Sequence, residues 1–245
     1  MTELKTYAVW DANVRVFHWL NVLCVIGLLA VGVAILNAKA LGVTDDGKIL
    51  LKTVHVWIGY VFAANLCWRL IWAFIGGPHA RWRAILPGGP GYLHDLRAYI
   101  ADFSRGRPRQ YVGHNPLGRI AVTLLLLLLL SQALTGLVLA GTDLFYPPLG
   151  SWIANWVATP GTEAATLVPY APEMYDETAY AAMRDFRKPF ITVHYYGFWV
   201  ILVFAVIHIL AVVITEVREG GTLVSAMVSG RKVLGEAPAD DRSAD

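Results

Sequence analysis

The sequence predicts an all-α membrane protein, a bundle of four transmembrane helices with further helices at the membrane interface. Of its 245 residues, 56% are hydrophobic and only 16% are charged, and the mean hydropathy is +0.51. A soluble domain usually has about a quarter of its residues charged. Four apolar runs reach the roughly 20 residues that cross about 30 Å of hydrocarbon. The net charge of +2 gives no signature of a nucleic-acid partner.

The four spans are expected at residues 16–36, 54–75, 117–140 and 190–214. The first run is too long for the core of a signal peptide and lacks a convincing cleavage site, so we expect a retained helix. Residues 1–233 are predicted to form one transmembrane domain, and residues 234–245 a polar C-terminal tail.

The placement of arginine predicts the orientation, because positively charged loops stay in the cytoplasm. The connection 76–116 is rich in arginine and has only Asp95 and Asp102 as acidic residues, whereas the connection 141–189 is mainly acidic. We therefore expect a cytoplasmic loop at 76–116, a periplasmic loop at 141–189 and both termini in the cytoplasm. The arginines are Arg81, Arg83, Arg97, Arg105, Arg107 and Arg109. Three lysines on the other side argue against this orientation, namely Lys39, Lys48 and Lys52.

Two shorter segments are predicted to lie along the inner membrane surface. "YLHDLRAYIADF" follows the helix breaker "PGGPG" and places Leu93, Leu96, Ile100 and Phe103 on one helical stripe. "TLVSAMVSGRK" follows the last span and ends in basic residues. Both patterns are typical of interfacial helices.

Four histidines lie in or at the ends of the spans: His18, His55, His194 and His208. An ionisable residue in a span indicates function by default. His194 and His208 are fourteen residues apart, which on a helix is a rise of about 21 Å and nearly four full turns. Both rings then face one direction at different depths. With the expected topology, depth pairs His18 with His208 near the inner surface and His55 with His194 near the outer surface.

Two bis-histidine sites favour two b-type haems, because imidazoles from two helices can ligate iron axially inside a helix bundle. Zinc usually takes three or four protein ligands at one depth. A proton relay normally includes intramembrane carboxylates, which these spans lack. Neither Cys24 nor Cys67 belongs to a Cys-x-x-Cys-His site for covalent haem. Each histidine taken alone could also be one that is bonded to a neighbouring helix.

Arg69 stands fourteen residues after His55 and so shares its face about 21 Å deeper, at the level of the inner haem. Its guanidinium could bind a haem propionate, as could Arg15 or Arg119 at the cytoplasmic helix ends. The alternative for all three is that the side chain extends to the lipid headgroups.

The segments "VWDANVRVFHWL", "HVWIGYVFAANLCWRLIWAFIG" and "GHNPLGR", with the closing His-x13-His helix, resemble the bacterial cytochrome b561 family. This family includes the b-type cytochrome subunits of nickel-iron hydrogenases, and the resemblance runs from about residue 9 to residue 233. It implies a di-haem cytochrome of the bacterial inner membrane that exchanges electrons between a periplasmic redox protein and membrane quinone. By position, His18, His55, His194 and His208 match the haem ligands of the family.

The resemblance also suggests that His114, in "GHNPLG", lies beside the inner haem and near the quinone. The alternative is that "HNP" simply starts a helix. The long outer loop carries aromatic residues that resemble family members working with c-type cytochromes instead of a hydrogenase. These are Trp152, Trp156, Tyr170, Tyr175 and Tyr180.

Three functions remain in competition: an electron-transfer subunit, a stand-alone haem enzyme that acts on superoxide or another small molecule with quinone, and a haem-free transporter or assembly factor. An acidic, aromatic outer loop favours docking of a protein, since a small substrate needs no such surface. We therefore favour the electron-transfer subunit, and leave open whether the chain is an enzyme by itself.

Overall fold

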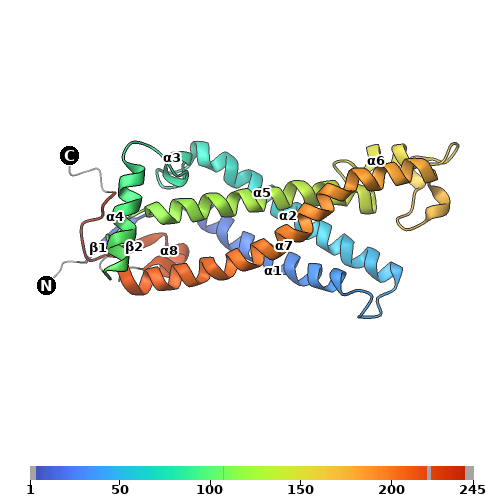
Figure 1. The fold of residues 1–245 in the computed structure, drawn as a ribbon. Coiled ribbons are helices and arrows are strands. Elements are labelled where there is room, and N and C mark those ends of the chain that lie inside the picture. Colours follow the sequence, from blue (N-terminus) through green and yellow to red (C-terminus); the bar gives the residue numbers. More distant parts are fainter. Residues whose placement is uncertain (1–3, 107, 220–221, 241–245) are drawn as a thin grey trace. The chain divides into compact units, whose positions relative to one another are not determined.

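The computed structural model describes residues 4–106, 108–219 and 222–240, and most of these are helical (Figure 1). Four of the helices are long and apolar enough to cross a membrane: α1 (Ala12–Leu36), α2 (Asp45–Ile75), α5 (Pro116–Leu144) and α7 (Glu177–Glu219). The four predicted spans and the all-α membrane class are thus confirmed.

Each long helix begins at a capping side chain. The caps are Asp11, Thr44, Asn115 and Asp176, whose oxygens accept hydrogen bonds of 2.7–3.2 Å from the backbone N–H three residues later. Such caps satisfy N–H groups that the first helical turn leaves unpaired. The helices therefore extend beyond the apolar runs, and α7 already begins within the predicted loop 141–189.

The chain divides into two compact units. Unit 1 comprises Met1–Trp19, Leu66–Leu127 and Ile201–Asp245, and unit 2 comprises Leu20–Asn65 and Leu128–Val200. Each of the four long helices passes from one unit to the other, so each unit contains a segment of all four.

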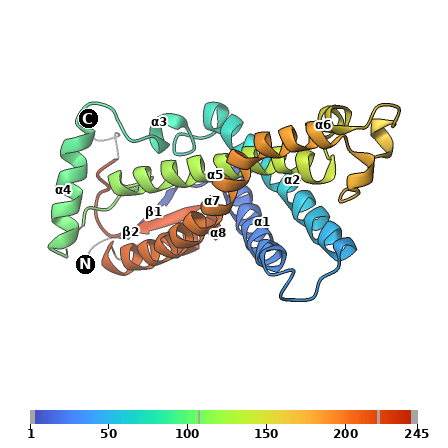
Figure 2. The ribbon, with the colours of Figure 1, turned by 45° about the vertical axis from the view of Figure 1, so that its right-hand side comes forward.

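Unit 1 contains a two-stranded sheet that the sequence did not predict. Strand β1 (Lys5–Ala8) pairs antiparallel with β2 (Arg231–Leu234), and α8 (Leu223–Ser229) leads into β2 (Figure 2). A buried cluster lies beside the sheet and contains Val9, Trp10, Val14, Ala80, Val112, Ala226 and Leu234. The basic end of the predicted interfacial segment 222–232 is therefore only partly at the surface, because Arg231 is exposed but Lys232 in β2 is only 3% exposed.

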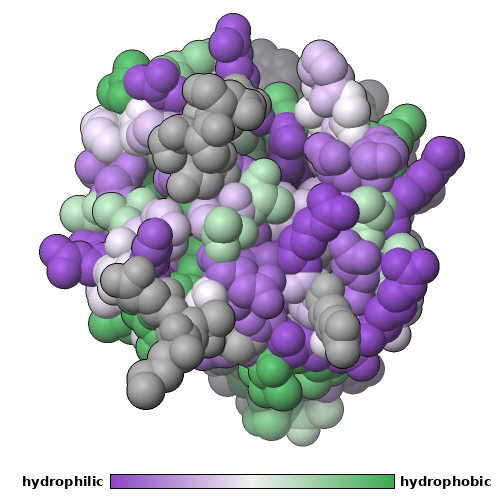
Figure 3. Space-filling model, turned by 90° about the vertical axis from the view of Figure 1, so that its left-hand side faces the viewer, coloured by the Kyte–Doolittle hydropathy of each residue, from purple (hydrophilic) through white to green (hydrophobic). Residues whose placement is uncertain are grey.

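Two more helices of unit 1 are α3 (Trp82–Ile85) and α4 (Tyr92–Ser104). Helix α4 matches the first predicted interfacial segment. It packs through the buried Tyr92 and Tyr99 and exposes Leu93 and Ile100 of the predicted apolar stripe. Hydrophilic side chains dominate the face of the molecule where α4 and the sheet lie (Figure 3). An apolar stripe beside a polar surface is typical of a helix at the membrane interface.

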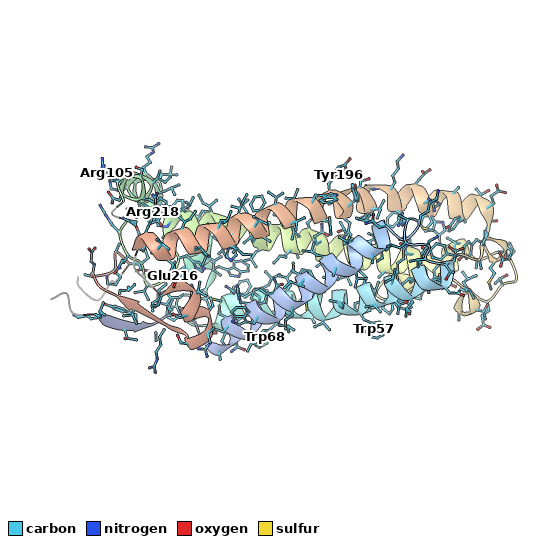
Figure 4. The ribbon with its side chains drawn as sticks, turned by 90° about the horizontal axis from the view of Figure 1, so that it is seen from below. Trp57, Trp68, Arg105, Tyr196, Glu216 and Arg218 are labelled. Atoms are coloured by element: carbon cyan, nitrogen blue, oxygen red, sulfur yellow. The ribbon has the colours of Figure 1, made fainter. Side chains whose placement is uncertain are left out.

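In unit 2 the segment predicted as an outer loop has a folded core. It contains α6 (Gly150–Val157) and the short helices η1 (Ala164–Thr166) and η2 (Pro172–Met174). Its buried residues are Ile153, Ala154, Val157, Leu167, Tyr175 and Met183. Elsewhere in unit 2, Trp57 and Tyr196 point outward from α2 and α7, as expected of side chains that contact lipid (Figure 4).

The turn between α8 and β2 yields a test of the sheet. Gly230 and Gly91 both have left-handed backbone angles, with φ of 79° and 77°. A Cβ at Gly230 would lie 2.6 Å from the Trp10 carbonyl oxygen, whereas no atom of the described residues lies within 4 Å of a Cβ at Gly91. Gly91→Ala should therefore cost about 1 kcal/mol of unfolding free energy from backbone strain alone, and Gly230→Ala clearly more. Thermal unfolding in detergent measures both, and equal losses would contradict the described turn.

Candidate functional site

The four histidines of the spans form two pairs, one in each unit. In unit 2, His55 on α2 faces His194 on α7, with ring centroids 6.2 Å apart and ring planes at 73°. In unit 1, His18 on α1 and His208 on α7 lie close enough to interact electrostatically. These are the pairs that helical depth predicts.

Thr135 on α5, which the sequence did not point to, holds the His194 ring. Its Oγ1 lies 3.0 Å from Nδ1 of His194 and donates its own hydrogen to the Ser131 carbonyl at 2.7 Å. The Thr135 oxygen is then the acceptor and Nδ1–H the donor, which leaves Nε2 of His194 with a free lone pair. A ligand histidine is usually held through its other ring nitrogen in this way. The sequence alone could not reveal this role of Thr135, because the role depends on α5 lying beside α7.

Small residues surround the unit 2 pair. A Cβ at Gly136 would lie 3.3 Å from the His194 ring, and one at Gly32 would lie 3.7 Å from the His55 ring. Among the residues that the structure describes, none comes within 4 Å of a Cβ at Gly59, one turn after His55. Gly197 instead receives the Gln132 side chain, which donates to the His194 carbonyl. Gly32 and Gly136 thus let the helix backbones come close to the two rings, and Gly59 leaves open space near His55.

This arrangement fits a b-type haem. An imidazole nitrogen binds a metal ion at about 2 Å, and its ring centre lies about 1 Å further, so rings flanking one ion have centres about 6 Å apart. The 6.2 Å between His55 and His194 agrees with that separation. Nδ1 of His55 is buried with no hydrogen-bond partner among the described residues. Within the same residues no three His, Cys, Asp or Glu side chains gather, so the donor sets are pairs.

The unit 1 pair has similar features. Nδ1 of His18 is buried, again without a partner in the described part of the chain. Arg69 is 5% exposed and donates to the Ala80 carbonyl at 3.2 Å, with its guanidinium over the Phe17 ring. Arg69 is therefore held inside unit 1 by protein contacts.

The two other predicted arginines contact the backbone of unit 1. Arg119 donates to three carbonyls, those of Arg83, Leu86 and Gly88, and packs over the Tyr92 ring. Arg15 lies against the turn at Gly230. Arg119 thus joins α5 to the segment after α3, a structural role that the sequence did not predict.

His114 precedes α5 and packs on Trp10, with ring centroids 4.7 Å apart. Its Nδ1 is buried and has no partner among the residues that the structure describes. Burial, aided by the nearby charges of Lys232, Arg69 and Arg119, lowers the pKa of His114 from 6.5 to about 3. The ring is therefore a neutral hydrogen-bonding group. Asn115 caps α5, so "HNP" does start a helix as the alternative interpretation held.

A buried polar cluster beside this histidine was not predicted. Tyr99 donates to Glu219 at 2.8 Å, and Asn115 donates to the Tyr99 oxygen at 2.7 Å. Lys232 donates to the carbonyls of Tyr111 and Gly113. Burial and the Glu219 carboxylate raise the pKa of Tyr99 well above its usual range, so its hydroxyl remains a donor.

A second unpredicted group is an ion triad in unit 2. Asp143 on α5 pairs with Lys52 on α2 and, through two hydrogen bonds of 2.6 and 3.1 Å, with Arg187 on α7. All three side chains are mostly buried. In the sequence, Lys52 was an argument against the orientation, and Asp143 was a charge of the outer loop. The structure places Asp143 within α5, which ends at Leu144, instead of in the predicted loop 141–189.

Long apolar helices with paired, inward histidines define an integral membrane protein of the b-type cytochrome class. The chain belongs to the prokaryotic cytochrome b561 family, whose sequence model matches residues 9–230. It is accordingly a multi-pass, haem-binding electron-transfer protein of the bacterial inner membrane.

Several curated relatives are similar over nearly their whole length. The probable Ni/Fe-hydrogenase B-type cytochrome subunit of Rhizobium leguminosarum bv. viciae is 28% identical, over 95% of this chain and 91% of the relative. That of Cupriavidus necator is also 28% identical, over 95% and 89%. The probable Ni/Fe-hydrogenase 1 B-type cytochrome subunit of Escherichia coli K12 is 25% identical, over 93% and 91%. No solved structure matches.

The buried His114 predicts a pH dependence of stability. An unfolded histidine takes up a proton below about pH 6.5, but the folded ring does so only near pH 3, so the unfolded state binds more protons in between. Stability is complete above about pH 6.5 and falls as the pH drops toward 3. Between about pH 6.5 and 4, the unfolding free energy should fall less steeply for His114→Gln than for the wild type. Denaturant titrations in detergent measure this.

Proposed function

We propose that this protein is a di-haem cytochrome that carries electrons across the membrane between an outer redox protein and membrane quinone. His55 and His194 would hold the outer haem b, and His18 and His208 the inner one. The observation that carries the proposal is that the rings of His55 and His194 face each other with centroids 6.2 Å apart. Thr135 holds Nδ1 of His194.

The residues of the chain and the cofactor have separate tasks in this proposal. When bound, each haem supplies an iron that gains or loses one electron. The histidines provide neutral ligands, Thr135 holds one ring in the required tautomer, and the surrounding apolar helices exclude water. The glycines beside the rings leave room for a flat group.

The orientation with both termini in the cytoplasm is part of the proposal. Arg81, Arg83 and Arg97 are exposed in unit 1, which suits a cytoplasmic side, whereas Arg107 lies outside the described residues. Two lysines that argued against this orientation are paired with carboxylates: Lys48 with Asp45, and Lys52 with Asp143. Their weight as topological signals is therefore smaller.

We place the quinone near His114. Its neutral ring has a buried nitrogen with no partner in the described part of the chain, which suits a hydrogen bond with a quinone. The adjacent Tyr99, Asn115 and Glu219 provide groups that exchange hydrogen bonds.

The outer partner would dock on the folded segment of unit 2. Trp152 and Tyr170 are exposed there, as are the acidic Glu163, Glu173 and Glu177. The names of the relatives favour a hydrogenase as this partner, and the acidic, aromatic surface would also suit a c-type cytochrome. The same names, which describe subunits, weigh against a stand-alone enzyme that acts on superoxide.

An optical spectrum tests the central claim. The purified protein, recorded as reduced minus oxidised, should show b-type bands that correspond to two haems per chain by pyridine haemochrome assay. One haem per chain would contradict the pairing, and none would contradict the whole proposal. Copurification from native membranes then identifies the redox partner.

Single ligand substitutions separate the two sites. His208→Ala should remove the inner haem and halve the haem content, because the two pairs share no ligand, and His55→Ala should remove the outer haem. The readouts are haem content and the number of midpoint potentials at equal protein yield. His94→Ala, at an exposed histidine of α4, is the matched control and should retain both haems. Loss of both haems from a folded His208→Ala variant would refute the pairing.

A further inference from the structure

A pocket of about 230 Å³ lies among the outer ends of three helix segments in unit 2. Its charged lining consists of Lys52, Arg184, Arg187 and Asp143, and its aromatic lining of Phe145, Tyr170, Tyr175 and Tyr180. Three cations face one carboxylate, so the pocket has a net charge of +2. A concave site with this charge attracts anions.

The cations of the pocket are held in place. Lys52 lies 5.2 Å from the Tyr170 ring centre, and Arg184 lies 6.0 Å from that of Tyr180. Arg187 and Lys52 share Asp143, which uses two of the five N–H donors of Arg187 and one of the three of Lys52. Donors therefore remain for a further anion.

The pocket is adjacent in sequence to the His55–His194 pair on the same helices. Lys52 precedes His55 by three positions, about one helical turn, and Arg187 precedes His194 by seven, about two turns. Residues at these spacings share a helix face. Asp143 also lies close enough to His194 to interact with it electrostatically.

We propose that this pocket binds the two propionate carboxylates of the haem that His55 and His194 hold. The inference rests on the proposed function. Two carboxylates match the net charge of +2, and the volume suits carboxylate arms and is too small for a porphyrin, since ligand pockets start at about 300 Å³. Arginine and lysine bind carboxylates through strong, charge-assisted hydrogen bonds. A free anion from solution has the same chemistry and is the alternative source.

The experiment compares haem b with its dimethyl ester, which lacks the two carboxylates. The full chain carrying His208→Ala, which retains only the His55–His194 pair, is depleted of haem and titrated with each porphyrin by absorbance. Haem should bind at least about tenfold more tightly than the ester, the effect of one charge-assisted hydrogen bond. With Arg184→Gln added, this preference should shrink several-fold. Arg184 is exposed and forms no part of the ion triad, so the variant should fold.

Lys188→Gln is the matched control. It removes one positive charge from the same stretch of α7, but Lys188 does not line the pocket, so the preference for haem should remain. The inference is overturned if haem and its ester bind equally. It is also overturned if Arg184→Gln and Lys188→Gln reduce the preference for haem by the same factor.

Sodium phosphate tests the alternative source. If it stabilises the haem-depleted protein with an intact pocket but not the Arg184→Gln variant, while haem and ester bind equally, the pocket holds a free anion and the propionate assignment is wrong. If no haem binds at all, the proposed function fails together with this inference. The two failures are therefore distinguishable.

Discussion

A polar side chain inside an apolar helix bundle is unfavourable by several kcal/mol unless a partner meets it, and this constraint governs the interior of the protein. Within the described residues, Thr135 meets His194, and the Ala80 carbonyl meets Arg69. Among the described residues, the Nδ1 atoms of His18, His55 and His114 are three of the buried polar atoms that lack a partner. A buried group without a partner needs an explanation, and in the proposed function the rings of His18 and His55 meet a bound haem.

The ion triad has a different purpose from simple stabilisation. A buried ion pair gains little net free energy, because desolvation offsets its Coulombic attraction. The triad Lys52–Asp143–Arg187 instead sets the position of α2, α5 and α7, the helices that carry His55, Thr135 and His194. The spacing of the two proposed ligands, His55 and His194, must be accurate within a fraction of an ångström. A specific polar contact close to the ligands provides that accuracy better than apolar packing alone.

In unit 1, polar groups distant in sequence meet around the start of α5. Asp240 accepts hydrogen bonds from the backbone of Val112 and Gly113, and Lys232 donates to the carbonyls that flank them. The segment before His114 is thus fixed by residues that follow the last span. The predicted polar tail 234–245 therefore contacts the bundle as far as Asp240, and its last five residues lie outside the described part. These contacts fix the surroundings of the proposed quinone site.

The sequence by itself determined the class, the four spans and the shared helix face of His194 and His208, because hydropathy and helical periodicity are local properties. Residues fourteen apart on one helix share a face whatever surrounds them. Only the tertiary structure decided which groups meet across helices. The predicted span 117–140 ends before Asp143, and no pattern in the sequence points to Thr135. The contacts of Asp143 and Thr135 depend on the distance between α5 and its neighbouring helices, which no local pattern encodes. For the same reason the pairing of β1 with β2, from opposite ends of the chain, appeared only in three dimensions.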